Sequence, residues 1–183
     1  MTQDFADDRL ARTLLDRSRR GDADAFAQLY RQQAQGIYGL ALRLTGDRSR
    51  AEDVTQETFL KALKGLRGYR GDAPVQVWLR RMAANASIDL LRGDARRGEA
   101  ELAELPADSD PEQQAEVRHA CGELARLRPQ ARAVVWLHTV EGWNHAELAA
   151  RFGRSESWSK SLLARSLKIL RERTGSTRTE QPA

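Results

Sequence analysis

Five residues between positions 78 and 92 combine an aromatic ring with polar groups that bind nucleic acids. They are Trp78, Arg81, Asn85, Asp89 and Arg92, and their spacing of three or four places them along one side of a helix. An indole among such side chains can stack on unpaired bases, because every base has a π-face. The alternative is a tryptophan at the margin of a core, with its indole N–H in water. Both interpretations remain open from this helix alone.

The segment before this helix adds basic and aromatic groups in a glycine-rich loop. It contains Arg67, Tyr69 and Arg70. From residue 64 to residue 97, eight basic residues stand against three acidic ones. An excess of this kind favours contact with phosphates.

A second basic face is predicted on the last helix of the chain, for which Ser155 is the expected N-cap. A short helix, a turn at Gly153 and this longer helix form the pattern of a helix-turn-helix. Its polar side chains could hold phosphates and reach guanines in a major groove. They are Arg154, Ser157, Lys160, Ser161, Arg165 and Lys168. A merely solvated face would usually mix the two signs, yet residues 151–178 contain eight basic and two acidic residues.

The hydrophobic pattern repeats near 3.6 residues throughout and predicts an all-α fold. Helices are expected at about 22–44, 49–65, 74–92, 111–127, 129–140, 145–152 and 155–173. Ser49 with Glu52, and Asn144 with Glu147, have the spacing of capping boxes at two helix starts. The residues expected on the apolar, core-facing sides of the first two helices are Phe26, Leu29, Tyr30, Ile37, Leu40, Ala41, Leu44, Val54, Thr58, Leu60 and Leu63.

Charge divides the chain of 183 residues into three parts. Residues 1–98 carry a net charge of +5, residues 99–116 carry −7 and residues 117–183 carry +6. An acidic stretch with two prolines is typical of a flexible linker, although a solvated helical stretch with a surface loop is an alternative. The expected organisation is a helical bundle, an acidic linker, a small helix-turn-helix domain and a disordered tail, at residues 1–98, 99–116, 117–176 and 177–183.

Several classes of protein are excluded or disfavoured. One cysteine, Cys121, excludes an internal disulfide. There is neither a signal-peptide pattern nor an apolar run of the roughly 18–20 residues that span a bilayer, so a soluble cytoplasmic protein is expected. The histidines (His119, His138 and His145) lack zinc-site spacing, and no phosphate loop or catalytic motif occurs. We therefore expect no enzyme activity, metal, cofactor or small-molecule substrate.

Four segments resemble a known family. GDADAFAQLYRQQAQGIYGLALRLTGD, AEDVTQETFLKAL and WLRRMAANASIDLLR are similar to successive motifs of the first helical domain of bacterial sigma-70-type sigma factors. LRPQARAVVWLHTVEGWNHAELAARFGRSESWSKSLLARSLKILRE resembles their promoter-binding helix-turn-helix domain. The match covers about residues 20–98 and 122–174, and the two-domain layout looks like the compact extracytoplasmic-function group.

The resemblance implies partners and site residues. The partners are the RNA polymerase core (its β′ coiled coil and β flap), promoter DNA and an anti-sigma factor. Core docking would fall to Asp53, Gln56, Glu57 and Leu60. The −10 element would be opened and read by Arg67, Tyr69, Arg70, Trp78, Arg81, Asn85, Asp89 and Arg92. The −35 element would be read by the basic face of the last helix together with Ser155 and Trp158.

The last helix departs from the family pattern. Ser157-Trp158-Ser159 stands where relatives often have Gly-Thr-Val, and Leu162 and Leu167 replace frequent arginines. These differences put the strength of DNA binding in question. They leave open a sigma-mimicking adaptor that binds an anti-sigma factor without DNA. A stand-alone helix-turn-helix regulator is a further alternative, but it leaves the EDVTQETF motif unexplained.

Overall fold

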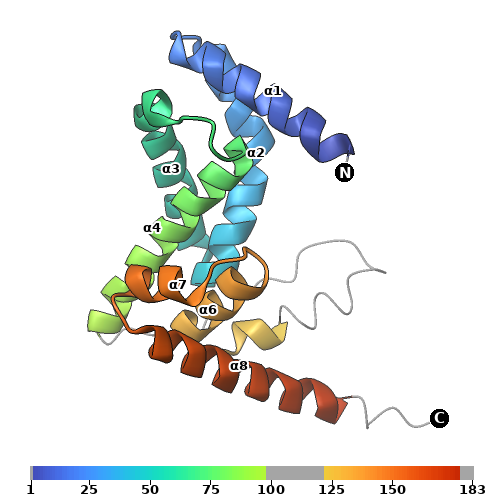
Figure 1. Cartoon of the computed structure of the whole chain (residues 1–183), viewed down its shortest axis with the longest axis vertical. Helices are drawn as coiled ribbons and strands as arrows, with labels where there is room; N and C mark the ends of the chain where they lie inside the picture. The colour runs from blue at the N-terminus through green and yellow to red at the C-terminus, as the bar shows by residue number, and fades with distance from the viewer. Residues whose placement is uncertain (1, 98–121, 178–183) are drawn as a thin grey trace, which may run out of the picture. The chain divides into compact units, whose positions relative to one another are not determined.

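The protein is built from helices in every part of the chain that the structure describes. The computed structural model describes residues 2–97 and 122–177 (Figure 1). The α-helices are α1 (Thr2–Arg19), α2 (Ala23–Thr45), α3 (Arg48–Gly65), α4 (Val75–Arg97), α6 (Pro129–Thr139), α7 (His145–Phe152) and α8 (Glu156–Thr177), with a short 3₁₀ helix η1 (Leu66–Gly68) after α3. Because these ranges contain no strand, the predicted all-α class is confirmed.

The chain forms two compact units. The first contains residues 1–41 and 48–86, and the second contains residues 42–47 and those after 86. The predicted acidic linker at 99–116 and most of the helix expected at 111–127 lie outside the described residues, as does the tail after residue 177. The domain boundaries inferred from charge therefore stay predictions.

The core of the first unit follows the helical repeat of its sequence. Leu29 and Ile37 of α2, Val54 of α3 and Leu79 of α4 are almost completely buried. Removing such side chains from water is the main favourable contribution to folding, at about 2 kcal/mol for each large one. The consequence is a fixed scaffold from which the polar faces of α3 and α4 project.

Two leucines of α3 lie on the opposite side of the helix from the one expected. Val54 and Thr58 are fully buried, as predicted, but Leu60 is 58% exposed, Leu63 is 48% exposed and Tyr30 is 41% exposed. At 100° per residue, Leu60 and Leu63 point away from the helix face that carries Val54 and Thr58. The prediction that Leu60 and Leu63 face the core was wrong, because it counted apolar residues without following the helical angle. Tyr30 is partly exposed, and its ring packs on that of the buried Phe59, with centroids 4.7 Å apart.

The predicted helix boundaries are confirmed at some ends and shifted at others. α2 ends at Thr45, followed by Gly46 with a φ of 71°. α3 begins at Arg48, so Ser49 lies inside its first turn rather than at the N-cap. No element was predicted before residue 22, yet α1 occupies residues 2–19.

In the second unit, α6, α7 and α8 pack against one another. Leu137, Leu148 and Phe152 are buried, and so is Ser159 on α8, with no exposed surface. A small side chain at position 159 lets α8 approach its neighbours closely. This packing fixes the direction in which the opposite, basic face of α8 points.

Candidate nucleic-acid interface

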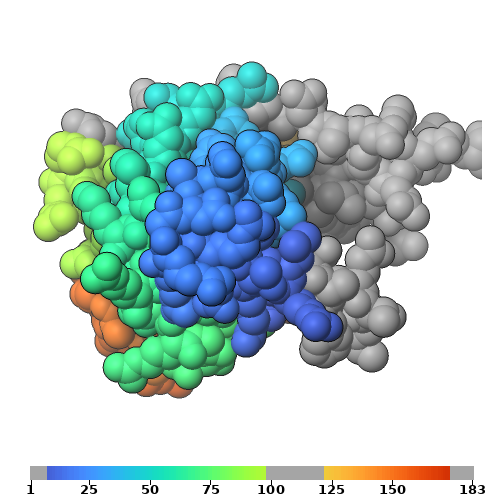
Figure 2. All heavy atoms as spheres, turned by 90° about the horizontal axis from the view of Figure 1, so that it is seen from above, coloured from blue at the N-terminus to red at the C-terminus, as the bar shows by residue number. Residues whose placement is uncertain are grey.

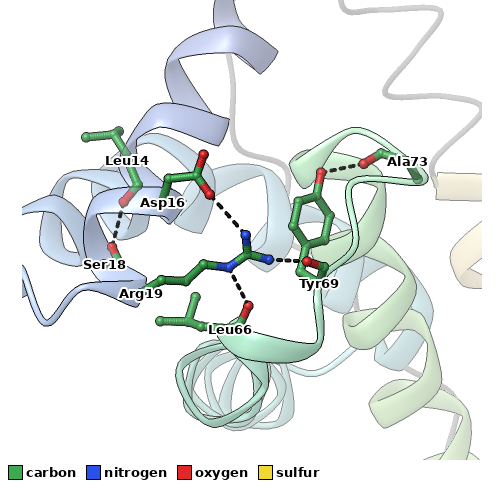
Figure 3. Close-up of polar contacts among 7 residues, drawn as sticks. All are labelled: Leu14, Asp16, Ser18, Arg19, Leu66, Tyr69 and Ala73. Atoms are coloured by element: carbon green, nitrogen blue, oxygen red, sulfur yellow. Dashed lines mark hydrogen bonds and ion pairs between the residues drawn. The ribbon is translucent and has the colours of Figure 1, made fainter.

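The loop between α3 and α4 is held in one shape by its own side chain–backbone bond. The Tyr69 hydroxyl donates a hydrogen bond to the carbonyl of Ala73, at 2.5 Å (Figure 3). Burial raises the pKa of the Tyr69 phenol, which keeps the donating proton in place. Gly71 has a φ of +83°, in the left-handed region that favours glycine. Arg67 and Arg70 are exposed on this constrained loop.

The aromatic ring on α4 lies next to the loop. The rings of Tyr69 and Trp78 have their centroids 5.1 Å apart, with planes inclined at 49°. Both side chains are half-buried. Trp78 is thus at the margin of the core and also presents part of its surface, so the structure places the two predicted aromatic groups together at the edge of the first unit.

The polar stripe on α4 continues from this aromatic pair. Arg81 and Asp89 are exposed, whereas Asn85 and Arg92 are half-buried. Arg92 Nη1 lies 4.0 Å from Asp89 Oδ1, one turn away on the same helix. Both side chains have shorter contacts with Arg151: Asp89 Oδ2 pairs with Arg151 Nη2 at 2.7 Å, and Arg92 Nη1 donates to the Arg151 carbonyl at 3.2 Å. This end of the stripe is therefore already engaged, and its DNA-binding role stays a prediction.

The side of α3 that faces away from the core combines acidic and apolar groups. Asp53, Gln56 and Glu57 are all exposed beside Leu60. Glu57 pairs with Lys61 at 2.5 Å, and Asp53 lies one turn back on the helix. Leu63 is a second exposed leucine on this side of α3, and the docking role of this edge stays a prediction.

The helix-turn-helix of the second unit is shaped by local caps. Asn144 and Glu147 form a complete capping box at the start of α7, as predicted. Gly153 ends α7 with a left-handed φ of +65°. The Ser155 hydroxyl accepts a hydrogen bond from the Trp158 amide at 3.2 Å, which confirms its prediction as the N-cap of α8.

The predicted DNA-facing side of α8 is open to solvent. The side chains of Arg154, Ser157, Lys160, Ser161, Arg165 and Lys168 are exposed. Lys160 pairs with Glu156 at 3.5 Å and Lys168 with Glu172 at 3.8 Å, both as exposed pairs within the helix. Such pairs are weak enough to be replaced by contacts with phosphates.

Trp158 and Ser159, the unusual residues of α8, turn toward the interior of the second unit. Trp158 is half-buried, and its ring centroid lies 5.3 Å from that of Phe152. Ser159 Oγ lies 3.0 Å from His145 Nδ1, and His145 stacks on His138 with centroids 4.5 Å apart. The tryptophan therefore presents only part of its ring outward, and its assignment to DNA reading stays a prediction.

Two groups that shape the candidate interface could not be found from the sequence. Arg19 and Asp8, both on α1, bond to the backbone at the two ends of the loop between α3 and α4. Their partners are 47 and 67 residues away, so no local spacing signals these contacts.

The described residues show neither a membrane-spanning helix nor a metal-binding cluster. Within residues 2–97 and 122–177, no helix combines the length and apolar character needed to cross a membrane. The same residues contain no group of three or more histidine, cysteine, aspartate or glutamate side chains arranged to hold a metal ion.

Family models match both units of the chain. The model of sigma-70 region 2 matches residues 29–97, and the model of sigma-70 region 4 matches residues 123–170. The first range contains the exposed edge of α3, the loop and the α4 stripe. The second contains the helix-turn-helix.

Individual relatives agree with these matches. The chain is 33% identical over 174 residues to the RNA polymerase sigma factor CarQ of Myxococcus xanthus, covering 91% of this chain and 98% of the relative. It is 34% identical over 170 residues to the ECF RNA polymerase sigma factor SigL of Mycobacterium tuberculosis, covering 86% and 94%. The relative SigE of Mycolicibacterium smegmatis is 33% identical but is covered over only 60% of its length.

Solved structures share the fold. The sigma factor RpoE of Bartonella quintana, solved with the anti-sigma factor NepR, aligns with a TM-score of 0.58 at 19% identity, over 80% of this chain and 94% of that one. CnrH, solved with the cytosolic domain of CnrY, aligns with a TM-score of 0.53 at 23% identity, over 94% and 99%. With matches to both sigma-70 regions and to a relative over nearly its whole length, the chain belongs to the sigma-70 family of RNA polymerase sigma factors, in its ECF group.

Proposed function

We propose that this protein is a non-catalytic specificity subunit that directs RNA polymerase core to promoters in the bacterial cytoplasm. Its −10 contacts come from the loop between α3 and α4 and from the polar stripe of α4, and its −35 contacts come from α8. No bond is made or broken by its side chains. Its contribution is the free energy of binding promoter DNA in the melted form.

The observation that carries this proposal is the pair formed by Tyr69 and Trp78. Two half-exposed rings 5.1 Å apart, flanked by Arg70 and Arg81, offer a stacking surface within a basic surround. Taking a base out of the duplex costs a few kcal/mol. Stacking that base on an aromatic side chain recovers about 1–3 kcal/mol, so capture of a small number of bases stabilises the opened strand.

The second unit supplies an anchor on duplex DNA. Its exposed arginines, lysines and serines on α8 suit the major groove of the −35 element. Each unit by itself would bind weakly. Joined in one chain and on one polymerase, they gain effective concentration for each other, so that promoter binding requires both elements at the correct spacing.

Docking on polymerase is assigned to the exposed edge of α3, at Asp53, Gln56, Glu57 and Leu60. This edge has polar and apolar groups in contact range of one another, which suits the β′ coiled coil. The β flap is the proposed contact of the second unit. These contacts leave the DNA-facing side chains of α4 and α8 available.

An anti-sigma factor is the proposed regulator. Two solved proteins of the same fold are described as complexes, RpoE with the anti-sigma factor NepR and CnrH with the cytosolic domain of CnrY. Inhibition by such a partner would require only that it cover the edge of α3 or the basic faces.

The test is run-off transcription with the purified chain, core polymerase and a promoter library. Initiation from a distinct set of sequences, absent with core alone, is the expected result. The double variant Asp53→Ala/Gln56→Ala, checked for retained helix content, is expected to lose both core binding and initiation. Initiation from no member of the library would overturn the proposal.

The same experiment separates the two alternatives. A stand-alone regulator would bind duplex sequences from the library without polymerase. A sigma-mimicking adaptor, which the atypical residues Ser157, Trp158 and Ser159 of α8 leave as an alternative, would bind an anti-sigma factor and select no DNA.

A further inference from the structure

The first helix of the chain has no role in the function described so far. α1 lies entirely before residue 29, where the match to sigma-70 region 2 begins. It is nevertheless an integral part of the first unit, because Ala11, Leu14 and Leu15 are at most 1% exposed. In Figure 2 the blue atoms of α1 lie against the green atoms of the segment around residue 75. This helix is therefore a fixed element beside the base-capture loop, defined here as residues 66–74.

One end of the base-capture loop is held by Arg19. Its Nε donates to the carbonyl of Leu66 at 2.7 Å, and its Nη2 donates to the carbonyl of Tyr69 (Figure 3). Its remaining nitrogen, Nη1, pairs with Asp16 at 3.0 Å. All three guanidinium nitrogens are thus used, in a planar arrangement that a lysine cannot reproduce.

The two carbonyls that Arg19 binds lie where the helical hydrogen bonds end, and that of Leu66 also accepts a hydrogen bond from the Tyr69 amide at 3.4 Å. They belong to η1 and to the residue after it. A cation at the C-terminal end of a helix is also favoured by the helix dipole. Arg19 therefore stabilises the point at which the chain leaves α3 and η1 and enters the loop.

The other end of the loop is held by Asp8. Its Oδ1 accepts a hydrogen bond from the amide of Val75, the first residue of α4, at 3.0 Å. Its Oδ2 pairs with Arg12 Nε at 2.8 Å, which directs the carboxylate toward the helix start. Asp8 supplies the N-terminal cap of α4 from a position 67 residues earlier.

These two attachments act on the aromatic pair. The Arg19 guanidinium lies 5.6 Å from the centre of the Tyr69 ring, and that ring lies 5.1 Å from Trp78. Tyr69 in turn closes the loop by its bond to Ala73. A contact made by α1 is in this way transmitted to both rings proposed to receive DNA bases.

We propose that α1 is a positioning element for base capture, with Arg19 and Asp8 fixing the base-capture loop in its DNA-binding shape. This inference rests on the proposed function of the loop. Neither residue needs to touch DNA. Because both ends of the loop are held, its conformational entropy is lost during folding. Little further entropy is then lost when DNA binds.

The experiment compares Arg19→Ala with Arg17→Ala in holoenzyme. Arg17 is on the same helix and loses the same charge, but its partner is Asp22 in the turn after α1. The probe is a fluorescein-labelled single-stranded oligonucleotide that carries the non-template −10 sequence selected by the wild-type protein in run-off transcription. Arg19→Ala is expected to bind it about tenfold more weakly, since two charge-assisted hydrogen bonds to the loop are lost. Arg17→Ala is expected to match the wild type.

Further measurements separate positioning from general stability. Affinity for core polymerase is expected to be equal in all variants, and amide hydrogen exchange at residues 69–73 is expected to be faster in Arg19→Ala. Arg19→Lys keeps the positive charge but lacks the planar guanidinium, so it is expected to restore only part of the affinity for the probe. A general folding defect would instead weaken core binding and probe binding together, and would count against the proposal.

Asp8→Ala tests the same idea from the other end of the loop. Asp8→Ala is expected to weaken binding of the probe and to leave the affinity for core polymerase unchanged. It provides an independent test if Arg19→Ala does not fold. Equal probe affinity of wild type, Arg19→Ala and Asp8→Ala would overturn the positioning role. Failure of the proposed function has a different signature, because the wild-type holoenzyme itself would then select no promoter.

Discussion

The base-capture loop and the helix-turn-helix differ in where most of their fixing contacts come from, although the loop also has one local bond, from the Tyr69 hydroxyl to the Ala73 carbonyl. In the helix-turn-helix, the bonds that set the turns join residues three apart, such as Asn144 with Glu147 and Ser155 with Trp158. In the loop, the bonds at both ends come from α1, 47 and 67 residues away. The difference teaches that the duplex-binding element is specified locally, whereas the element proposed to hold unpaired bases depends on the packing of the whole first unit.

The largest effect is expected from Trp78→Ala. Loss of the stacking surface should reduce capture of the single-stranded −10 probe by roughly 10- to 100-fold, corresponding to about 1–3 kcal/mol for one stacked base. Trp78→Phe, which keeps a ring, should retain much of the binding. Binding of duplex −35 DNA should not change. If Trp78→Ala weakened binding of the duplex −35 DNA as much as binding of the single-stranded −10 probe, the proposal that the two regions bind different DNA elements would be wrong.

A smaller effect is expected from Asn144→Ala, which removes the local cap of α7. The loss should be about 1 kcal/mol of local stability, measured as faster hydrogen exchange of the α7 amides. Asn144→Asp keeps the accepting oxygen and serves as the matched control. Capture of the single-stranded probe should be unaffected, in contrast to Arg19→Ala. If probe capture also fell, the two elements would be coupled rather than independent.

The smallest effect is expected from pH. Burial lowers the pKa of His145 from its ordinary value of 6.5, and the neighbouring His138 and Lys160 lower it further. The unfolded chain then binds a proton more readily than the folded one, so stability is lost as pH falls through 6.5 toward the lowered pKa. The melting temperature should drop slightly between pH 7.5 and 5.5, and less so in His145→Asn. A rise in melting temperature over that interval would contradict the assignment.

The helix pattern and both candidate interfaces could be predicted from residues near in sequence. The capping box at Asn144 and the N-cap at Ser155 follow from side chains bonding to backbone within one turn, and the end of α2 follows from Gly46 in the left-handed region. Two leucines show the limit of this reasoning. Leu60 and Leu63 are apolar and at plausible spacing, yet they lie outside the core because the helix turns them away from Val54. Their exposure is what makes the edge of α3 a candidate docking surface.

By itself, the sequence determined the all-α class, the turns of the helix-turn-helix and the basic character of the loop, of α4 and of α8. These properties depend on local hydrogen bonds, helical periodicity and net charge, all of which are readable in order along the chain. Only the tertiary structure decided that α1 exists as a docked helix and that Arg19 and Asp8 hold the base-capture loop. The physical reason is that the polar contacts of α1 join groups far apart in the sequence, which only packing brings within hydrogen-bonding distance.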